Sequence, residues 1–290
     1  MSGRLLFTWK DGLEVLDLGT SKLTQLVPAP SGARVASARW SPSGSQIAYA
    51  VSPQQVGSAT VSAIIVASSD GSSARPVASS DGTNVFYQWP VWGPDGSHLF
   101  ALRAEPNSAR IERISLATAE RQTVLDRVAD YDVSRDGRII VFVRNADAGA
   151  SLNLARIDGG GEPSVLVSPQ PLRVVAAPRF THDGRSILFS LSRPPAPESS
   201  RPDSSRLAIL IGVPTAHAHG FPQDIYSVPI EGGPMQLMIR LGVDDPVGTW
   251  SPDSTRLAGL TPDSLGLATP GGTFTPILAP GGLGSVDWAP

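Results

Sequence analysis

The sequence predicts an all-β protein built as a six-bladed β-propeller, with four antiparallel strands in each blade. Three observations lead to this prediction. Glycine and proline account for 29 and 27 of the 290 residues, which indicates many turns and few long helices. A signature of turn residues and alternating apolar residues recurs along the chain. The two ends of the chain carry complementary halves of that signature, which predicts a single closed ring.

The repeated signature starts at an anchor residue, usually aromatic, and continues through a small residue, often Pro, and a polar-Gly turn into an alternating apolar run. Its clearest copies are WSPSGSQIAY at 40–49 and WGPDGSHLF at 92–100. Each copy indicates a strand, a tight turn and a strand, because Asp-Gly supplies the positive-φ position that a hairpin needs. Degraded copies start at Val133 and Phe180, and a fifth copy starts at Trp250.

A further strand, a Gly turn and a final strand complete each unit. The clearest example is the run 224–230, which is followed by Glu231, Gly232 and Gly233. Between 38 and 70 residues separate successive anchors along the chain. Four short strands per unit at this spacing, with no helical pattern, are typical of a propeller blade.

The ends of the chain supply the blade count. Residues 286–290 match the first half of the signature, and residues 3–8 match its second half. We therefore expect a single domain over 1–290 in which the C-terminal strand is the innermost strand of a blade whose outer three strands are N-terminal. The predicted blades are blade 1 at 285–290 plus 1–28, blade 2 at 36–80, blade 3 at 88–126, blade 4 at 130–168, blade 5 at 176–240 with an insertion at 193–223, and blade 6 at 247–280.

Composition excludes several classes of protein. The formal net charge of −3 gives no support for nucleic-acid binding. The sequence contains no run of 18 apolar residues, so we expect no membrane span in it. The absence of cysteine excludes disulfides, thiolate nucleophiles and Cys-ligated zinc. The first residues lack the pattern of a signal peptide, so we expect either a protein that stays inside the cell or a mature domain of a longer exported chain. A closed ring is expected to be monomeric.

The strings WSPSGSQIAY and DIYSVPIEGG resemble the repeats of the TolB-type six-bladed propeller family. The resemblance covers the chain apart from the blade 5 insertion, and it departs from the pattern at Val133 and Phe180, which replace Trp, and at Ser254, which replaces Gly. It implies a bacterial sensory or docking domain in the periplasm or outside the cell, although a cytoplasmic location is left open. The repeats build blades rather than sites, so they indicate fold far more strongly than function.

Four charged residues lie directly before an anchor. Around the ring, the residues at this position are Asp287, Arg39, Val91, Asp132, Arg179 and Thr249. We expect them at the central channel or at the blade interfaces, where Asp287 neighbours Arg39 and Asp132 neighbours Arg179. Opposite charges on successive blades predict structural ion pairs that offset the cost of partial burial. A channel that binds an ion is the alternative interpretation.

Strand parity separates the loops into two faces. The Asp-Gly turns lie on one face, whereas the inter-blade loops and the connections between second and third strands lie on the other, where we expect recognition. The candidate binding residues on this second face are Tyr87, Trp89, Asp130, Tyr131, Asp244 and Asp245.

Blade 5 carries the one feature that the repeat does not explain. Its anchors are 70 residues apart, against 38 to 52 elsewhere, and the surplus lies between 191 and 224. Long loops in compact domains are usually functional or disordered. The insertion contains His217 and His219, which on a strand would point the same way, as a metal pair needs, with Asp224, Asp244 or Asp245 nearby. Solvated imidazoles are the simpler interpretation.

The sequence contains no catalytic signature: no G-x-S-x-G elbow, no H-E-x-x-H, no P-loop and no thiol. We therefore expect a non-catalytic propeller that binds a protein, peptide or other ligand and needs no cofactor. One alternative is a metal-dependent hydrolase, lactonase or lyase in which His217 and His219 hold a divalent ion at the channel mouth. Another is the gating propeller of a peptidase.

Overall fold

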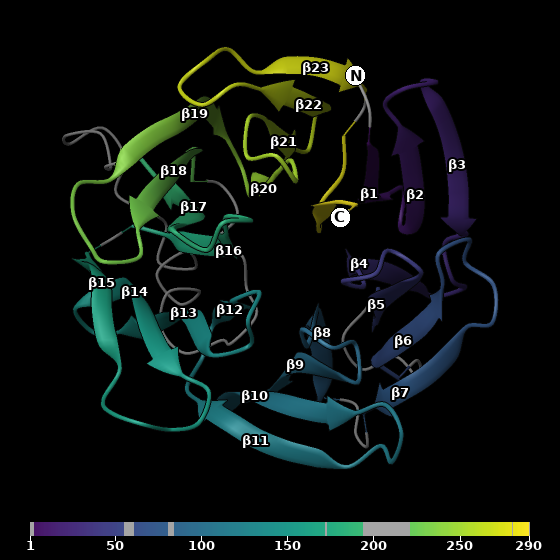
Figure 1. Cartoon of the computed structure of the whole chain (residues 1–290), viewed down its shortest axis with the longest axis horizontal. Helices are drawn as coiled ribbons and strands as arrows, with labels where there is room; N and C mark the ends of the chain where they lie inside the picture. The colour runs from purple at the N-terminus through teal and green to yellow at the C-terminus, as the bar shows by residue number, and fades with distance from the viewer. Residues whose placement is uncertain are drawn as a thin grey trace.

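The chain folds as a ring of six four-stranded antiparallel sheets (Figure 1). The computed structural model describes residues 3–54, 61–80, 84–171, 173–193, 221–279 and 281–289. The prediction of an all-β, six-bladed propeller is confirmed. Across these ranges, no helix is long and apolar enough to cross a membrane.

Each blade runs from an innermost strand at the channel to an outermost strand at the rim. The strands, from the inside outward, are β24 (Val286–Trp288), β1 (Arg4–Trp9), β2 (Gly12–Asp17) and β3 (Lys22–Val27) in blade 1, and β4 (Ala33–Trp40), β5 (Gln46–Pro53), β6 (Ala63–Ser68) and β7 (Arg75–Ser79) in blade 2. Blade 3 contains β8 (Phe86–Trp92), β9 (His98–Glu105), β10 (Ser108–Ser115) and β11 (Arg121–Asp126), and blade 4 contains β12 (Asp130–Val133), β13 (Ile139–Ala146), β14 (Gly149–Arg156) and β15 (Ser164–Gln170). Blade 5 contains β16 (Val175–Phe180), β17 (Ser186–Ser192), β18 (Gln223–Pro229) and β19 (Gln236–Val243), and blade 6 contains β20 (Val247–Trp250), β21 (Leu257–Leu260), β22 (Leu265–Ala268) and β23 (Thr275–Leu278).

The ring is closed by the pairing of β24 with β1. The two strands are antiparallel, and Leu6 stands opposite Asp287 in the register. Backbone hydrogen bonds from Thr8 N–H to the Ser285 carbonyl (3.1 Å) and from Ala289 N–H to the Arg4 carbonyl (2.9 Å) extend this pairing at both ends. Both chain ends therefore lie in one blade, as the complementary half-repeats predict.

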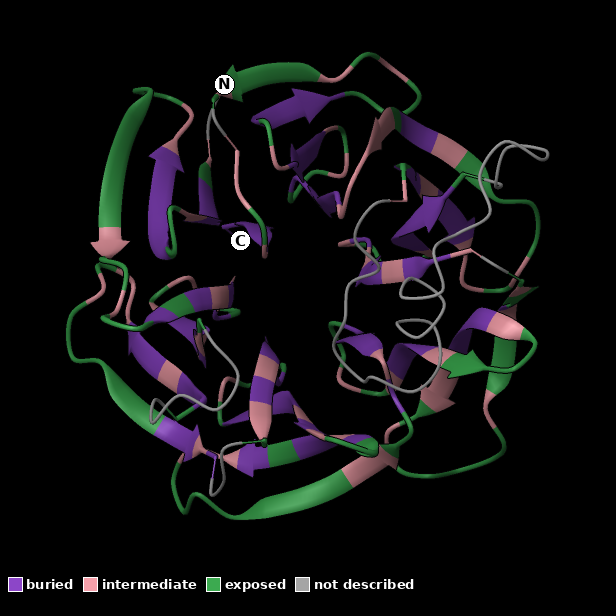
Figure 2. Cartoon of the chain, turned by 180° about the vertical axis from the view of Figure 1, so that it is seen from behind, coloured by how far each residue is buried: buried purple, intermediate pink, exposed green. Residues whose placement is uncertain are grey.

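The core lies between neighbouring blades. The anchor residues Trp40, Trp92, Trp250 and Trp288 are all buried, as expected for large apolar side chains at one fixed place in a blade. Figure 2 shows the gradient across each blade: the inner strands are buried, whereas an outermost strand such as β3 is mainly exposed. The blades are therefore packed around a buried centre, and their outermost strands face solvent.

The polar-Gly turns adopt the conformation that the repeat requires. Gly44, Gly96, Gly137 and Gly184 occupy the same turn position with φ between 68° and 70°, a region open to Gly at little cost. In blade 6 that position is Ser254, with φ 55°. The turn aspartates Asp95, Asp136, Asp183 and Asp253 each accept the backbone N–H two residues on. These carboxylates therefore stabilise their own turns.

Blade 6 is built differently from the others. Its four strands have only four residues each, whereas β4, β5, β9, β10, β13 and β14 have eight. Gly259 pairs with Gly248 on one side and with Gly266 on the other, so a row of three glycines crosses the blade. A Cβ on Gly266 would lie 2.5 Å from Cζ of Phe274, so this ring occupies the space that the missing side chains leave.

Candidate functional site

The charged residues before the anchors meet at the centre of the ring. The innermost strands β24, β4, β12 and β16 carry Asp287, Arg39, Asp132 and Arg179 respectively, and these strands surround the channel (Figure 1). Asp287, Asp132 and Arg179 are buried, and the Arg39 side chain is only 14% exposed. The register of the repeat therefore concentrates four charges in one small, largely buried volume.

Arg39 links the two aspartates. Its Nη1 lies 3.3 Å from Oδ1 of Asp287, and its Nη2 lies 3.2 Å from Oδ1 of Asp132. The pairing of Arg39 with Asp287 on the neighbouring blade agrees with the sequence expectation. The partner of Asp132 differs from the expectation, because it is Arg39 of blade 2 and not Arg179 of blade 5. Blade 3 contributes the shorter, uncharged Val91 at this position and offers Asp132 no charge.

The same aspartates join consecutive blades through the backbone. Oδ2 of Asp287 accepts the N–H of Trp40 at 2.8 Å, and Oδ2 of Asp132 accepts the N–H of Phe180 at 2.9 Å. Each carboxylate therefore accepts the anchor N–H of the next blade with one oxygen and forms an ion pair with Arg39 through the other. These aspartates act as structural links of the ring, because both of their oxygens are engaged by the protein itself.

The two channel arginines have opposite pKa shifts. Burial alone would lower the pKa of Arg39, but the charges of Asp132 and Asp287 outweigh it and the pKa lies above its ordinary value. The pKa of Arg179 is lowered, first by burial and then by the charge of Arg39. Burial raises the pKa of Asp287, in spite of Arg39 and the Trp40 N–H. Arg39 is therefore the arginine whose charge the cluster compensates.

The aromatic candidates for a recognition face need correction. Tyr87 and Tyr131 are 0% exposed, and Trp89 is also buried, so none of the three can contact a partner on the surface. The Tyr87 hydroxyl donates to Glu112 Oε2 at 2.8 Å and accepts from Arg121 Nη1 at 2.9 Å, while burial, followed by Glu112, raises the pKa of Tyr87 to about 12. These residues belong to β8 and β12 rather than to inter-blade loops, and their side chains pack in the core between neighbouring blades.

The acidic candidates differ among themselves. Asp130 is buried and accepts the N–H of Ala177 from blade 5 at 2.7 Å, so it too links two blades. Asp244 and Asp245 are half-buried beside the base of the blade 5 insertion. Oδ1 of Asp245 accepts from Nε2 of Gln223 at 3.2 Å. Of the six candidates, this acidic pair alone reaches the surface.

The metal hypothesis involves two histidines of the insertion and the nearby aspartates. His217 and His219 lie outside the described residues. Asp224 is fully engaged: its carboxylate receives Nε and Nη2 of Arg193, both at 2.9 Å, and the N–H groups of Leu241 and Gly242 at 2.7 and 2.8 Å. Burial would raise the pKa of Asp224, but these hydrogen bonds bring it below its ordinary value. Asp224 therefore anchors the base of the insertion. In the described part of the chain, no three His, Asp or Glu residues are grouped to hold a metal ion.

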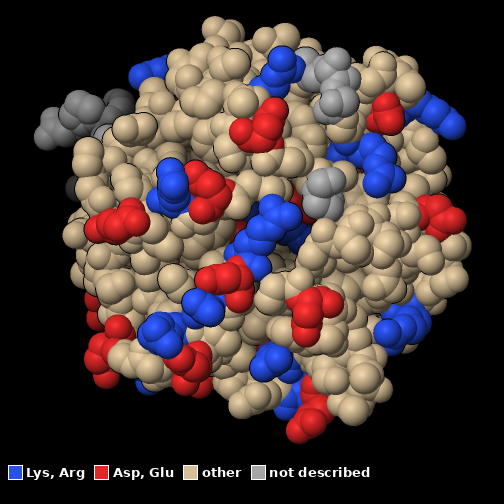
Figure 3. Space-filling model, viewed as in Figure 1, with Lys and Arg blue, Asp and Glu red and all other residues tan. Residues whose placement is uncertain are grey.

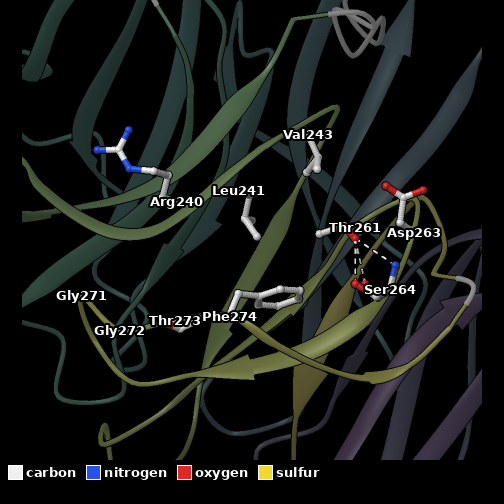
Figure 4. Close-up of a pocket in the computed structure, with 10 residues that line it drawn as sticks. All are labelled: Arg240, Leu241, Val243, Thr261, Asp263, Ser264, Gly271, Gly272, Thr273 and Phe274. Carbon is white, nitrogen blue, oxygen red and sulfur yellow. Dashed lines mark hydrogen bonds between the residues drawn. The ribbon is translucent and has the colours of Figure 1, made fainter.

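A groove that the sequence did not reveal lies between blades 5 and 6 (Figure 4). Its volume is about 460 Å³. Leu241 and Val243 of β19 line one side, and Phe274 of blade 6 lies opposite Leu241. The charged groups of Arg240 and Asp263 lie at opposite ends of this apolar surface in Figure 4. Two features of the sequence could have indicated the groove: the glycines of 259–272 and the short spacing of the blade 6 strands. Both leave blade 6 small.

The groove and the channel differ in how far the protein uses their polar groups. In the channel, the carboxylates of Asp132 and Asp287 are occupied by neighbouring blades. At the groove, Arg240 and Asp263 form no ion pair within the described chain. The groove is therefore chemically open to a ligand, whereas the aspartates of the channel are committed to the fold.

Comparisons with known proteins identify the fold. No protein-family model and no curated protein matches the sequence. Among solved structures, TolB from Acinetobacter baumannii is 16% identical, with a TM-score of 0.72 over 99% of this chain and 67% of that chain. A chain of a nidogen/laminin complex is 12% identical, with a TM-score of 0.72 over 100% of this chain and 99% of that chain. An oligogalacturonate lyase in complex with manganese is 13% identical, with a TM-score of 0.59 over 92% of this chain and 70% of that chain. At these identities the likeness concerns the fold, and the chain has the fold of the TolB-like six-bladed propellers.

Proposed function

We propose that this chain is a non-catalytic binding propeller that takes a protein or peptide partner in the groove between blades 5 and 6. The observation that carries the proposal is the groove itself, with its apolar sides and its two charged residues, Arg240 and Asp263, left without an ion pair in the described chain. Its volume of about 460 Å³ lies within the range of ligand sites and has room for a few residues of an extended peptide.

Apolar contact and rim charge suit a peptide. Phe274 and Leu241 offer apolar surface to one side chain of a partner, and burial of that side chain supplies affinity. Arg240 and Asp263 at the two ends favour a segment that carries opposite charges in the matching order, because complementary rim charges set orientation and partner choice. Asp244 and Asp245 directly follow Val243, a lining residue of the groove, in the chain.

The likeness to solved structures agrees with this assignment. TolB and the chain from the nidogen/laminin complex share the ring, and the second of these was solved in complex with another protein. The likeness to TolB also supports our proposal that the chain acts in the periplasm or outside the cell. The manganese-bound lyase favours a second candidate function, a metal-dependent lyase, in which His217 and His219 would hold the metal.

Filling the groove tests the proposal. Thr273 is exposed and lines the groove, so Thr273→Trp should occupy it, whereas Thr118→Trp places the same ring on an exposed turn of blade 3. A display library of random peptides is panned on the wild-type propeller, and the recovered peptides are titrated by fluorescence polarisation. We expect Thr273→Trp to raise their Kd roughly tenfold and Thr118→Trp to leave it unchanged. Failure to recover a binding peptide, or equal binding to both variants, would overturn the proposal.

The lyase candidate has a separate test. Purified protein is incubated with MnCl₂, dialysed, and measured for bound metal and for its melting temperature with and without a chelator. Stoichiometric manganese together with a melting temperature that falls on chelation would favour the lyase over the binding module. An unchanged melting temperature and no retained metal are the results expected for the binding module.

A further inference from the structure

The residues before the anchors repeat approximately after half a turn of the ring, but the two arginines among them have different partners. Around the ring, the positions before the anchors contain Asp287, Arg39 and Val91, and then Asp132, Arg179 and Thr249. The two aspartates have equivalent roles, since each accepts the anchor N–H of the following blade. The two arginines do not: they occupy the same position of the repeat but have different partners.

Arg39 uses its guanidinium fully as an ion-pair donor, whereas Arg179 does not. Arg39 binds one carboxylate through each of its terminal nitrogens. Arg179 donates through Nη1 to the carbonyl of Pro178, at 2.7 Å, and its other N–H groups have no acceptor within the described chain. Arg179 is only 7% exposed. The N–H groups of Arg179 without an acceptor are not fully buried, so they remain accessible to solvent and to a ligand.

We propose that the central channel binds one carboxylate group at Arg179. A carboxylate fits the planar fork of a guanidinium, which can donate two parallel N–H···O bonds to it. A single negative charge suits the channel better than a phosphate does, because Asp130, Asp132 and Asp287 all lie close enough to act on Arg179. The proposal concerns the channel and is independent of the groove between blades 5 and 6.

The surroundings favour entry of an anion. Figure 3 shows Lys and Arg side chains gathered at the centre of the ring, where this face is hollowed. His182 is half-buried and lies close enough to Arg135 and Asp287 for both charges to act on it, while burial is the main cause of its lowered pKa. The lowered pKa of Arg179 indicates a cation that an added anion would stabilise.

Titration with two carboxylates tests the proposal and distinguishes a small free anion from a carboxylate on a peptide. Sodium acetate represents a small free anion, and acetyl-Gly-Asp-Gly-amide represents a carboxylate on a peptide. Each is titrated by calorimetry near pH 7, with sodium chloride added to hold the ionic strength constant. We expect saturable binding of one carboxylate per chain. Binding of acetate alone would identify a small anion, and binding of both would identify a carboxylate that a peptide can deliver.

Matched arginine variants locate the site. Arg179→Gln should weaken binding about tenfold or more, whereas Arg185→Gln, at an exposed turn of the same blade, should leave it unchanged. If Arg179→Gln does not fold, the Nε–H signal of Arg179 in the ¹⁵N spectrum of the wild-type protein serves instead, and it should shift saturably with acetate but not with chloride. Equal binding by Arg179→Gln, or a signal that moves alike with both salts or with neither, would overturn the proposal.

Discussion

Removal of the Arg39 guanidinium should destabilise the ring strongly. In Arg39→Met the apolar stem keeps its packing, but Asp132 and Asp287 lose the cation that each holds through Oδ1. Both carboxylates still accept an anchor N–H from the following blade, so they stay fixed in the channel near one another. The variant therefore leaves two buried negative charges in one small volume with a single hydrogen bond each.

The size of this effect follows from burial. The side chains of Arg39, Asp132 and Asp287 are 14%, 8% and 13% exposed, so solvent screens their charges little. Loss of one partner from a buried ion pair costs about 3–5 kcal/mol. Arg179 lies in the same cluster and can turn toward one of the aspartates, so we expect the loss to fall near the lower end, at about 3 kcal/mol.

Urea unfolding followed by tryptophan fluorescence measures this loss. Arg34→Met is the matched control, since Arg34 is exposed on the same strand and its loss should change stability by less than about 0.5 kcal/mol. The combined variant Arg39→Met with Asp287→Asn should recover part of the loss, because it removes one of the two unpaired charges. An Arg39→Met protein within about 1 kcal/mol of the wild type would refute the view that this cluster holds the blades together.

Three further predictions concern blades 5 and 6. Gly266→Ala would place a Cβ 2.5 Å from Phe274 and 2.7 Å from a backbone carbonyl, so we expect a loss of about 1–3 kcal/mol in urea unfolding, and an unchanged midpoint would contradict this packing. Hydrogen bonds from Ser251 and Thr255 lower the pKa of Asp253 to about 2 from 3.8, so its ionised form stabilises the fold above pH 3.8 and this contribution is lost as the pH falls toward 2. Asp253→Asn should therefore show a shallower fall of melting temperature over that window, and a slope equal to that of the wild type would argue against it. Asp224→Ala removes the acceptor of four hydrogen bonds, so amide exchange at Leu241 should accelerate and stability should fall by about 3 kcal/mol, whereas unaltered exchange would contradict its anchoring role.

The fold could be predicted from the sequence because its determinants are local. Each Asp-Gly turn is set by a few neighbouring residues, and the alternation of apolar residues after it determines which face of a strand is buried. The number of blades followed from the matching ends of the chain, which pair as β24 and β1. The same register predicted that Arg39 and Asp287 are neighbours at the channel or at a blade interface, and they form an ion pair there.

The finer contacts could not be predicted because they depend on distances across the ring. Asp132 and Arg39 are 93 residues apart in the chain. Nothing in the local sequence indicates that Asp132 pairs with Arg39 across the ring and not with Arg179 of the next blade. Tyr87 and Tyr131 looked like loop residues because each precedes an anchor by a few positions, yet β8 and β12 already include them. The groove depends on how Phe274 fills the space above Gly266, which is a property of packing and not of pattern.

The cluster in the channel separates stability from binding. The closing strand β24 contributes only three residues to the ladder with β1, so the side chain of Asp287, which reaches Trp40 and Arg39 of blade 2, is a second attachment of that strand to the ring. Arg39 is committed to this attachment, whereas Arg179 donates, among the residues that the structure describes, only to its neighbouring carbonyl. Substitution of Arg39 should therefore reduce stability more than it reduces carboxylate binding, and substitution of Arg179 should do the reverse. Two arginines at equivalent positions of one repeat would then have diverged, one to close the ring and the other to bind a carboxylate.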